Sequence, residues 1–168
     1  MTICKRRTIK MILVIKPLNN ENVNDFVNFV YYARETESEV FFNKQINKVL
    51  FAKETRERMM NNLFYPTKTL LAYENERVIG RIEYHFYGCY MDGYKMAYVD
   101  WIYVLKEKRH LGVAKTLFRA FEEDCKKHRI NQYFLIRATN SEAVKFYDSF
   151  SDVETKMELI LRKDIDDN

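Results

Sequence analysis

The feature that most constrains the fold of this chain is a change in the spacing of its apolar residues. In the first third of the chain they recur at helical spacing, which predicts one helix starting near Val23 and a second over about residues 44–63. The spacing then becomes that of β-strands, and strands are predicted over residues 69–73, 78–87 and 96–104. Short polar turns separate these strands, so we expect an antiparallel meander.

The chain on either side of the meander completes a mixed pattern of strands and helices. The further predicted elements are a strand, a helix, a strand, a helix and a strand, over residues 12–16, 111–128, 132–137, 141–150 and 153–161. This order predicts an α/β (α+β) fold with a mixed, mostly antiparallel central sheet of about six to seven strands flanked by helices. Only 4 Gly and 2 Pro are present, which argues against a linker. We therefore expect a single domain over residues 1–168, with residues 1–10 as a candidate for a poorly ordered extension.

The N-terminal residues resemble the opening of a signal peptide but do not complete one. Basic residues precede an apolar run over residues 11–15, yet Lys16 and Pro17 end the run early and no small-residue cleavage site follows. We interpret the run as the first strand. Met1 and Met11 are both candidates for the start of translation.

Charge and cysteine content narrow the classes of function. The formal net charge of +4 fits an anionic ligand but is too weak to indicate nucleic-acid binding by itself. Cys4, Cys89 and Cys125 are odd in number and form no CxxC pair, so neither a metal site nor a disulfide framework is expected. A cytoplasmic location is the expectation for such a chain.

The turn between the strand ending at Val104 and the helix beginning at Leu111 has the composition of an anion-binding site. The first N–H groups of a helix have no partners inside it and carry partial positive charge. Gly112 lets a ligand approach the backbone closely, and Ala114 is nearly as small. The basic residues of this segment are Lys106, Lys108, Arg109 and Lys115. We expect a diphosphate or a similar anion here, and the alternative is a solvated helix start with a basic flank.

Two motifs resemble signatures of the GNAT superfamily of N-acetyltransferases. Arg109-x-x-Gly112-x-Ala114 is similar to the Q/R-x-x-G-x-G/A signature, and Asn140-x-x-Ala143-x-x-Phe146-Tyr147 is similar to N-x-x-A-x-x-F-Y. Each lies between a predicted strand and a predicted helix, and the element order from Ile12 also resembles that of the family. The chain departs from the family in having Ser149-Phe150 where Gly-Phe is frequent, and Ala114 where the last small residue is often Gly.

The resemblance implies acetyl-CoA as the acyl donor, an amine as the acceptor and direct transfer between them in a ternary complex. It further implies that the pantetheine arm pairs with the backbone of residues 102–104, where this strand diverges from the strand at residues 132–137. A backbone N–H there polarises the thioester carbonyl. The residues that it assigns to acetyl-CoA are Ile102, Tyr103, Val104, Arg109, His110, Leu111, Gly112, Val113, Ala114, Lys115, Asn140, Ala143 and Tyr147. Asn140 has a second interpretation as the cap of the last helix.

Acetyl transfer to an amine requires two proton transfers. An alkylammonium with a pKa of about 10 must lose a proton before it attacks, and a leaving thiolate whose conjugate acid has a pKa of about 8.5 benefits from a proton donor. The resemblance assigns the donor role to Tyr147, whose alternative is a helix tyrosine packed beside Phe146.

Three residues are candidates for the base. Asp100 comes first, because a two-residue strand period places it on the same face as Ile102 and Val104. Glu83 is the second candidate and His85 the third. For each of them, the alternative is an ordinary solvated or hydrogen-bonded strand residue.

The acceptor is expected between the first two helices and the turn over residues 87–95. The tyrosines that could wall such a pocket are Tyr84, Tyr87, Tyr90, Tyr94 and Tyr98. Glu35, Glu37 and Glu39 could attract a cationic amine, and a solvated charge run is the alternative. These features favour an amine of modest size.

Two other functions stay open at this point. One is an acyl-CoA-binding sensor without turnover, which an intact Tyr147 and Asn140 argue against only weakly. The other is a nucleic-acid-binding module, but the basic residues are scattered among acidic ones and no recognition signature is present. A homodimer is compatible with the family resemblance, and neither a membrane nor a nucleic-acid partner is expected.

Overall fold

The computed structural model describes residues 12–37, 47–64 and 66–163. The chain forms two compact units, one extending to Leu135 and the other starting at Ile136. None of the helices in the described part of the chain combines the length and the apolar character needed to cross a bilayer.

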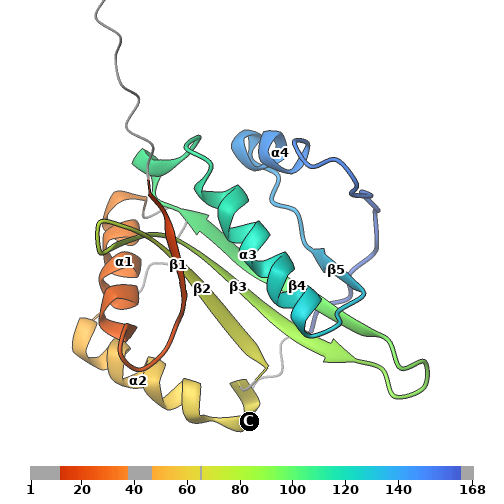
Figure 1. The fold of residues 1–168 in the computed structure, drawn as a ribbon, viewed down its shortest axis with the longest axis horizontal. Coiled ribbons are helices and arrows are strands. Elements are labelled where there is room, and N and C mark those ends of the chain that lie inside the picture. Colours follow the sequence, from red (N-terminus) through yellow and green to blue (C-terminus); the bar gives the residue numbers. More distant parts are fainter. Residues whose placement is uncertain (1–11, 38–46, 65, 164–168) are drawn as a thin grey trace, which may run out of the picture. The chain divides into compact units, whose positions relative to one another are not determined.

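The first unit is built on one sheet with the strand order β1-β2-β3-β4-β5 (Figure 1). The strands are β1 (Val14–Pro17), β2 (Thr67–Glu74), β3 (Arg77–Gly88), β4 (Lys95–Val104) and β5 (Gln132–Leu135). The first four are antiparallel, which confirms the predicted meander, and β5 is parallel to β4. The helices and 3₁₀ turns of the two units are α1 (Val23–Thr36), α2 (Lys48–Met60), η1 (Asn62–Phe64), η2 (Lys106–Lys108), α3 (Val113–Lys127) and α4 (Ser141–Tyr147).

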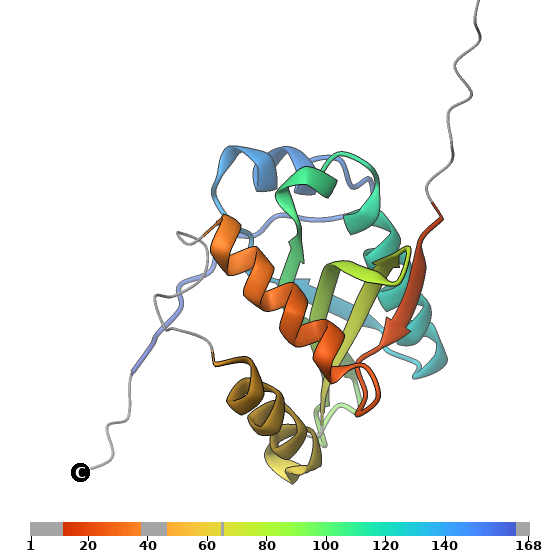
Figure 2. The ribbon, with the colours of Figure 1, turned by 90° about the vertical axis from the view of Figure 1, so that its left-hand side faces the viewer.

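Helices α1 and α3 cover opposite faces of the sheet (Figures 1 and 2). The ring of Phe29 on α1 lies edge-on to Tyr103 of β4, with 6.0 Å between centroids. On the other face, Phe121 of α3 packs against Tyr84 of β3, with 4.7 Å between centroids. We call these surfaces the α1 face and the α3 face. The apolar stripe predicted for α3 is confirmed, because its buried residues follow a helical period: Val113, Leu117, Phe118, Phe121 and Cys125.

Gly80 allows α3 to pack closely on the sheet. A Cβ at this position would lie 3.1 Å from the Val113 side chain and 3.3 Å from that of Leu117. Because those two residues are in the first half of α3, the missing side chain sets how near the N-terminal end of this helix approaches the central strands.

A β-bulge at Asp100 interrupts the regular alternation of β4. Glu83 of β3 pairs with Trp101, whereas the next residue, Tyr84, pairs with Val99, so Asp100 has no partner in the register. Trp101 and Tyr103 therefore lie on the α1 face, and Ile102 and Val104 lie on the α3 face. The two-residue period used to place Asp100 with Ile102 and Val104 fails at this point, because the bulge adds one residue.

The second unit contains α4 but no strand among its described residues. Asn140 caps α4, its Oδ1 accepting a hydrogen bond from the backbone N–H of Ala143 at 2.9 Å. The strand predicted over residues 153–161 is absent, and the sheet has five strands rather than six to seven in the part of the chain that the structure describes. Apolar alternation makes a segment suitable for a half-buried strand, but a strand also needs a neighbour that satisfies its backbone. Met157 and Leu159 are fully exposed in this tail.

Candidate functional site: the loop before helix α3 and the α1 face

The loop between η2 and α3 has two residues in the left-handed region of backbone conformation. Gly112, at the N-cap of α3, has φ 81°, and His110 has φ 61°. Glycine reaches this conformation without steric cost. A Cβ on Gly112 would meet no atom within 4 Å among the described residues. The loop therefore presents backbone to open space beside Gly112.

The N-terminus of α3 differs from those of α2 and α4 in the groups that cap it. Asn47 accepts hydrogen bonds from two N–H groups of α2 and Asn140 from one N–H group of α4, whereas the N-cap of α3 is a glycine. The first turn of α3 contains no acidic residue. The N–H groups of Val113, Ala114 and Lys115 are thus available to an external anion, and the helix dipole favours one.

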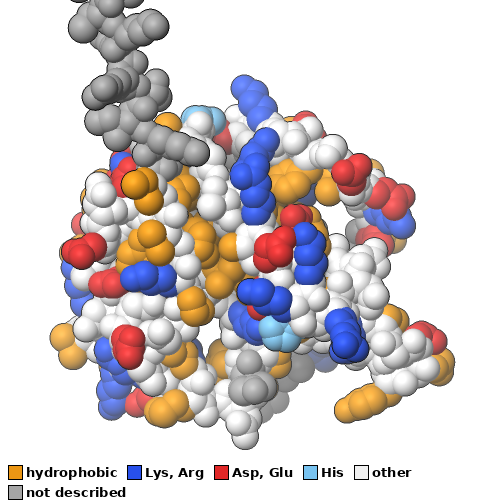
Figure 3. Space-filling view, in the orientation of Figure 1, with side chains coloured by type: hydrophobic (Ala, Val, Ile, Leu, Met, Phe, Trp, Pro, Cys, Tyr) orange, Lys and Arg blue, Asp and Glu red, His pale blue; other side chains and the backbone are white. Residues whose placement is uncertain are grey.

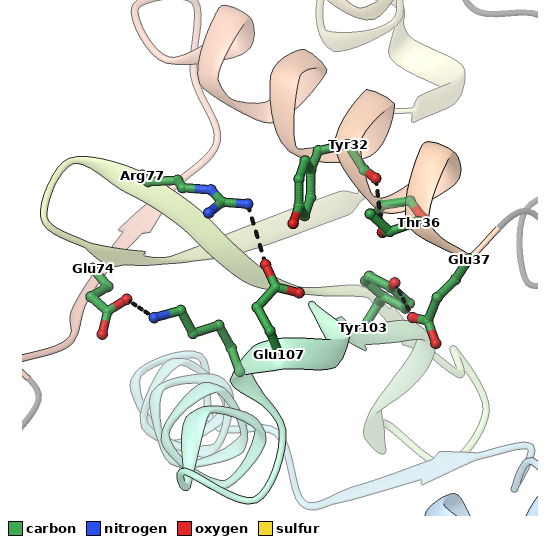
Figure 4. Close-up of polar contacts among 9 residues, drawn as sticks. Tyr32, Thr36, Glu37, Glu74, Arg77, Tyr103 and Glu107 are labelled. Carbon is green, nitrogen blue, oxygen red and sulfur yellow. Dashed lines mark hydrogen bonds and ion pairs between the residues drawn. The ribbon is translucent and has the colours of Figure 1, made fainter.

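Arg109 does not extend toward that open space. Its Nη2 donates to Glu37 Oε2 at 2.5 Å, and its Nε donates to the carbonyl oxygen of Val104 at 3.2 Å. The Tyr103 hydroxyl donates to the same Glu37 oxygen (Figure 4). Burial and this hydrogen bond raise the pKa of Tyr103. Only 5% of the Glu37 side chain is exposed, so Glu37 is a buried anchor rather than part of a solvated charge run. Glu35 is exposed, and Glu39 lies outside the described residues.

Two more ion pairs hold η2 to the turn between β2 and β3 (Figure 4). Lys108 pairs with Glu74, and Arg77 pairs with Glu107 at 3.4 Å. Two of the four basic residues expected to supply charge are therefore already paired inside the fold. Lys106 and Lys115 are exposed and have no ion pair within the part of the chain that the structure describes.

The edge of β4 next to β5 is paired along only part of its length. Met96–Val99 pairs with Gln132–Leu135, while pairing with β3 on the other side continues to Val104. The backbone of residues 100–104 therefore has no strand partner on the β5 side among the described residues. This is the stretch of β4 that the family resemblance assigns to the pantetheine arm.

The three candidates for the base lie on β4 (Asp100) and on its neighbour β3 (Glu83 and His85). Asp100 is exposed and has no hydrogen bond or ion pair within residues 12–37, 47–64 and 66–163. In contrast, Glu83 Oε2 accepts from Arg81 Nη1 at 2.9 Å and from Thr69 Oγ1 at 3.1 Å. His85 Nδ1 lies 3.1 Å from Thr67 Oγ1. Asp100 is thus the candidate whose carboxylate the fold leaves most accessible.

The buried guanidinium of Arg81 interacts with the negative charges of Glu83 and Asp100. Burial lowers the pKa of its guanidinium, and the charges of Glu83 and Asp100 oppose that shift. Its Nε is buried without a hydrogen-bond partner among the described residues. The ion pair to Glu83 compensates part of the cost of burying this charge. The carboxylate of Glu83 is therefore committed to a structural partner.

The second unit brings together Asn140, Ala143 and Tyr147. The Tyr147 ring lies 5.3 Å from that of Phe146, and the Arg137 guanidinium lies 5.8 Å from the Tyr147 ring centroid. Burial raises the pKa of the Tyr147 phenol, and the charge of Arg137 opposes this. A tyrosine hydroxyl with the ordinary pKa of about 10 is already protonated at neutral pH, which is the form a proton donor needs, and the shift makes it a weaker acid.

The structure divides the five tyrosines expected to wall an acceptor pocket. Tyr84 is buried on the α3 face, where its hydroxyl donates to Asp124 Oδ2 at 2.7 Å. Tyr90 is fully exposed in the hairpin that projects beyond β3 and β4 (Figure 1). Tyr87 and Tyr98 lie on the α1 face together with Phe134 of β5. Phe134 was not among the residues predicted for the acceptor pocket, although it lies in the strand predicted over residues 132–137.

The comparisons with known proteins agree with this architecture. The Acetyltransferase (GNAT) family matches residues 31–151. No curated protein matches the chain. A ribosomal-protein-alanine N-acetyltransferase from Brucella melitensis biovar Abortus 2308 has a similar structure, with a TM-score of 0.69 at 15% identity, covering 90% of this chain and 99% of that one.

Two further solved structures show the same fold at low identity. An integron cassette protein from the mobile metagenome of V. cholerae has a TM-score of 0.76 at 18% identity, covering 90% of this chain and 92% of that one. An aminoglycoside acetyltransferase from an uncultured soil metagenomic sample, solved with sisomicin, has a TM-score of 0.67 at 14% identity, covering 89% and 97%. The family match spans most of the chain and includes both sequence motifs. The chain belongs to the GNAT family of acetyltransferases.

Proposed function

We propose that this chain is an N-acetyltransferase that moves the acetyl group of acetyl-CoA directly to an amine, either a small amine or the amine of a peptide. The observation that carries the proposal is the N-terminus of α3, where Gly112 is left-handed and open to solvent and the first turn has no acidic residue. Such a terminus fits the pyrophosphate of a coenzyme. Membership of the family makes acetyl-CoA the expected donor.

The donor site on this chain consists mainly of backbone. The N–H groups of Val113, Ala114 and Lys115 would bind phosphate oxygens, and Lys106 and Lys115 would add positive charge. The β4 backbone at residues 102–104 would pair with the pantetheine arm. Arg109 would act indirectly, because its side chain holds the loop to Glu37.

The transfer step then needs two side chains to move protons. Asp100, directly or through a water, would accept the proton that the ammonium loses, which leaves a neutral nitrogen to attack the thioester carbonyl. The new C–N bond forms as the C–S bond breaks, Tyr147 would donate its proton to the departing thiolate, and the proton that the newly acylated nitrogen loses would restore the Tyr147 hydroxyl. We favour Asp100 over Glu83 because Asp100 is exposed, whereas the Glu83 carboxylate is stabilised as the charged form by its ion pair with the buried Arg81.

The acceptor is less constrained than the donor. The names of two structural neighbours point to ribosomal-protein alanine and to aminoglycosides, but identities of 15% and 14% support a shared fold alone. A binding protein that senses acetyl-CoA without turnover is the competing function. Acidic and basic side chains are interspersed on the face drawn in Figure 3, which does not favour a nucleic-acid surface there.

Thermal unfolding with and without acetyl-CoA tests the donor half of the proposal. A ligand at 100 times its Kd stabilises the folded state by about 2.7 kcal/mol, which corresponds to a rise in Tm of roughly 5–10 °C for a chain of this size. Release of CoA thiol in the presence of a panel of amines tests the acceptor half. A Tm that does not respond to acetyl-CoA or CoA would refute the donor site. A clear response without thiol release from any amine would favour the sensor.

A further inference from the structure

A row of aromatic side chains crosses β3, β4 and β5 on the α1 face. His85 stacks on Tyr98 with 6.3 Å between ring centroids and 17° between planes, and Tyr98 lies 5.0 Å from Phe134. Tyr87 lies edge-on to Phe134 at 6.3 Å. We call these four residues the aromatic row.

The register of the sheet places the members of the row on one face. Tyr98 is paired directly with His85 on one side and with Phe134 on the other, and directly paired residues point to the same face. The row is partly open to solvent, since 42% of Tyr87 and 44% of Phe134 are exposed. Tyr90 and Met91 in the projecting hairpin are also exposed, but the ring contacts that define the row within the described part of the chain do not include them.

One end of the aromatic row carries an available negative charge. Asp100 follows Tyr98 by two residues on β4, and its negative charge adds to burial in raising the pKa of the Tyr98 phenol. Asp100 sits in the bulge, where β4 loses its pairing with β5. Along β4, Asp100 therefore lies between Tyr98 of the aromatic row and the stretch proposed for the pantetheine arm.

Carboxylate and rings together specify the chemistry of a complementary ligand. An ammonium group placed at Asp100 gains from the carboxylate and from the nearby Tyr98 ring, and a cation over an aromatic ring gains about 0.5–2 kcal/mol. A flat apolar group beyond the ammonium would cover Tyr98 and Phe134 and remove their exposed surface from water. A polyhydroxylated polycation would need further carboxylates for its other ammonium groups. Glu83 is already paired with Arg81, so such a ligand would gain little from this surface.

We propose that the acceptor is an arylalkylamine: a single primary amine separated by one or two carbons from an aromatic ring. The ammonium binds at Asp100 and the ring lies on Tyr98 and Phe134, which are the residues that determine specificity. This inference rests on the proposed acetyltransferase function and adds the class of its acceptor.

Three amines separate this acceptor class from the alternatives. We would measure kcat/KM from CoA thiol release with phenethylamine, with ethanolamine as a ringless primary amine, and with sisomicin as a polyhydroxylated polycation. We expect kcat/KM for phenethylamine to exceed that for either of the others at least tenfold. Equal values for phenethylamine and ethanolamine, or a preference for sisomicin, would overturn the proposal.

Substitutions in the row test whether these residues provide the selectivity. Phe134→Ala and Tyr98→Leu should each raise KM for phenethylamine about tenfold and change KM for ethanolamine less than twofold. Tyr90→Leu is the matched control, because Tyr90 is a fully exposed tyrosine of the β3–β4 hairpin and lies outside the row. It should leave all three rates unchanged. A loss of equal size for all amines in the row variants would contradict a role in specificity.

Binding measured without turnover separates failure of this inference from failure of the proposed function. Trp101 is the one tryptophan in the chain and is paired with Glu83 on the same face as the row. Titrating phenethylamine into the protein saturated with CoA should give a saturable change in tryptophan fluorescence that Phe134→Ala weakens about tenfold. Such binding without thiol release would uphold the acceptor class and refute turnover. Thiol release from other amines without phenethylamine binding would refute the acceptor class alone.

Discussion

The two ends of β4 show opposite ways of building a binding surface. At its C-terminal end, ion pairs to Glu37, Glu74 and Arg77 fasten the segment leading into α3, and the surface left for a ligand is mainly backbone. Toward its N-terminal end, Tyr98 and its neighbours on the α1 face present their own side chains, with Phe134 44% exposed.

This difference follows from what each region would recognise. A diphosphate is bound well by N–H groups and a helix dipole, so the side chains around the loop are free to stabilise it. An amine attached to a variable group must be recognised by the size, flatness and charge of side chains. Donor binding should therefore be sensitive to the conformation of the loop, and acceptor choice to substitutions on the α1 face.

The largest effect should come from changing the conformation of the donor loop. Gly112→Val puts a β-branched residue at φ 81° and fills the open space beside the loop, so we expect acetyl-CoA affinity to fall at least about 100-fold. Gly93→Val is the matched control, since Gly93 has φ 66° and equally open surroundings in the β3–β4 hairpin. Both variants should lose stability, but only Gly112→Val should lose the Tm response to acetyl-CoA. A retained response would remove the loop from the site.

Tyr147→Phe tests the proposed role of Tyr147 as the proton donor, which neither end of β4 supplies. Removal of a general acid commonly lowers rate about 100-fold or more, so kcat should fall by that order while the Tm response to acetyl-CoA is kept. Tyr32→Phe, on the exposed side of α1, should leave kcat unchanged. If both variants turn over at the parent rate, Tyr147 is not the acid.

Glu37→Gln should weaken the donor loop from a distance. It removes the negative charge of Glu37 from the pair with Arg109, and we expect a loss of about 2 kcal/mol in stability and about a tenfold rise in KM for acetyl-CoA with a smaller change in kcat. The control is Glu107→Gln, whose ion pair with Arg77 has side chains 40% and 50% exposed and should contribute about 0–1 kcal/mol. Matching KM values for the two variants would show that the Glu37–Arg109 pair serves folding alone.

Asp124→Asn should affect stability without affecting either ligand. Burial alone would raise the pKa of Asp124, but hydrogen bonds from Tyr84 and Lys68 outweigh burial and lower it. Because the folded pKa is below the ordinary value of about 3.9, this stabilisation is present above that pH and disappears as pH falls through the folded pKa. Urea unfolding should show a difference of about 1–3 kcal/mol at pH 7 that shrinks below about pH 4. A constant difference at all pH values would contradict this account.

Features that depend on residues close together in the sequence could be predicted, whereas features that depend on residues far apart could not. The meander, α3 and the cap of α4 were predicted because apolar period and capping residues act within a few positions. The strand over residues 153–161 was predicted wrongly, since alternation shows that a segment could be half-buried but not that another strand pairs with it. The role of Glu37 was missed because its partner Arg109 is 72 residues away.

The sequence by itself determined the family and the order of elements from β1 to α4, and it led to the proposal of a donor loop before α3. These depend on short-range rules: a strand, a turn with glycine at a left-handed position, and a helix whose first N–H groups have no partner. The tertiary structure alone decided which charges around that loop are available, because ion pairs from distant elements occupy Lys108 and Arg109. It also decided the surface that we propose for the acceptor, because the bulge at Asp100 moves that residue out of register and the pairing of three strands assembles the aromatic row.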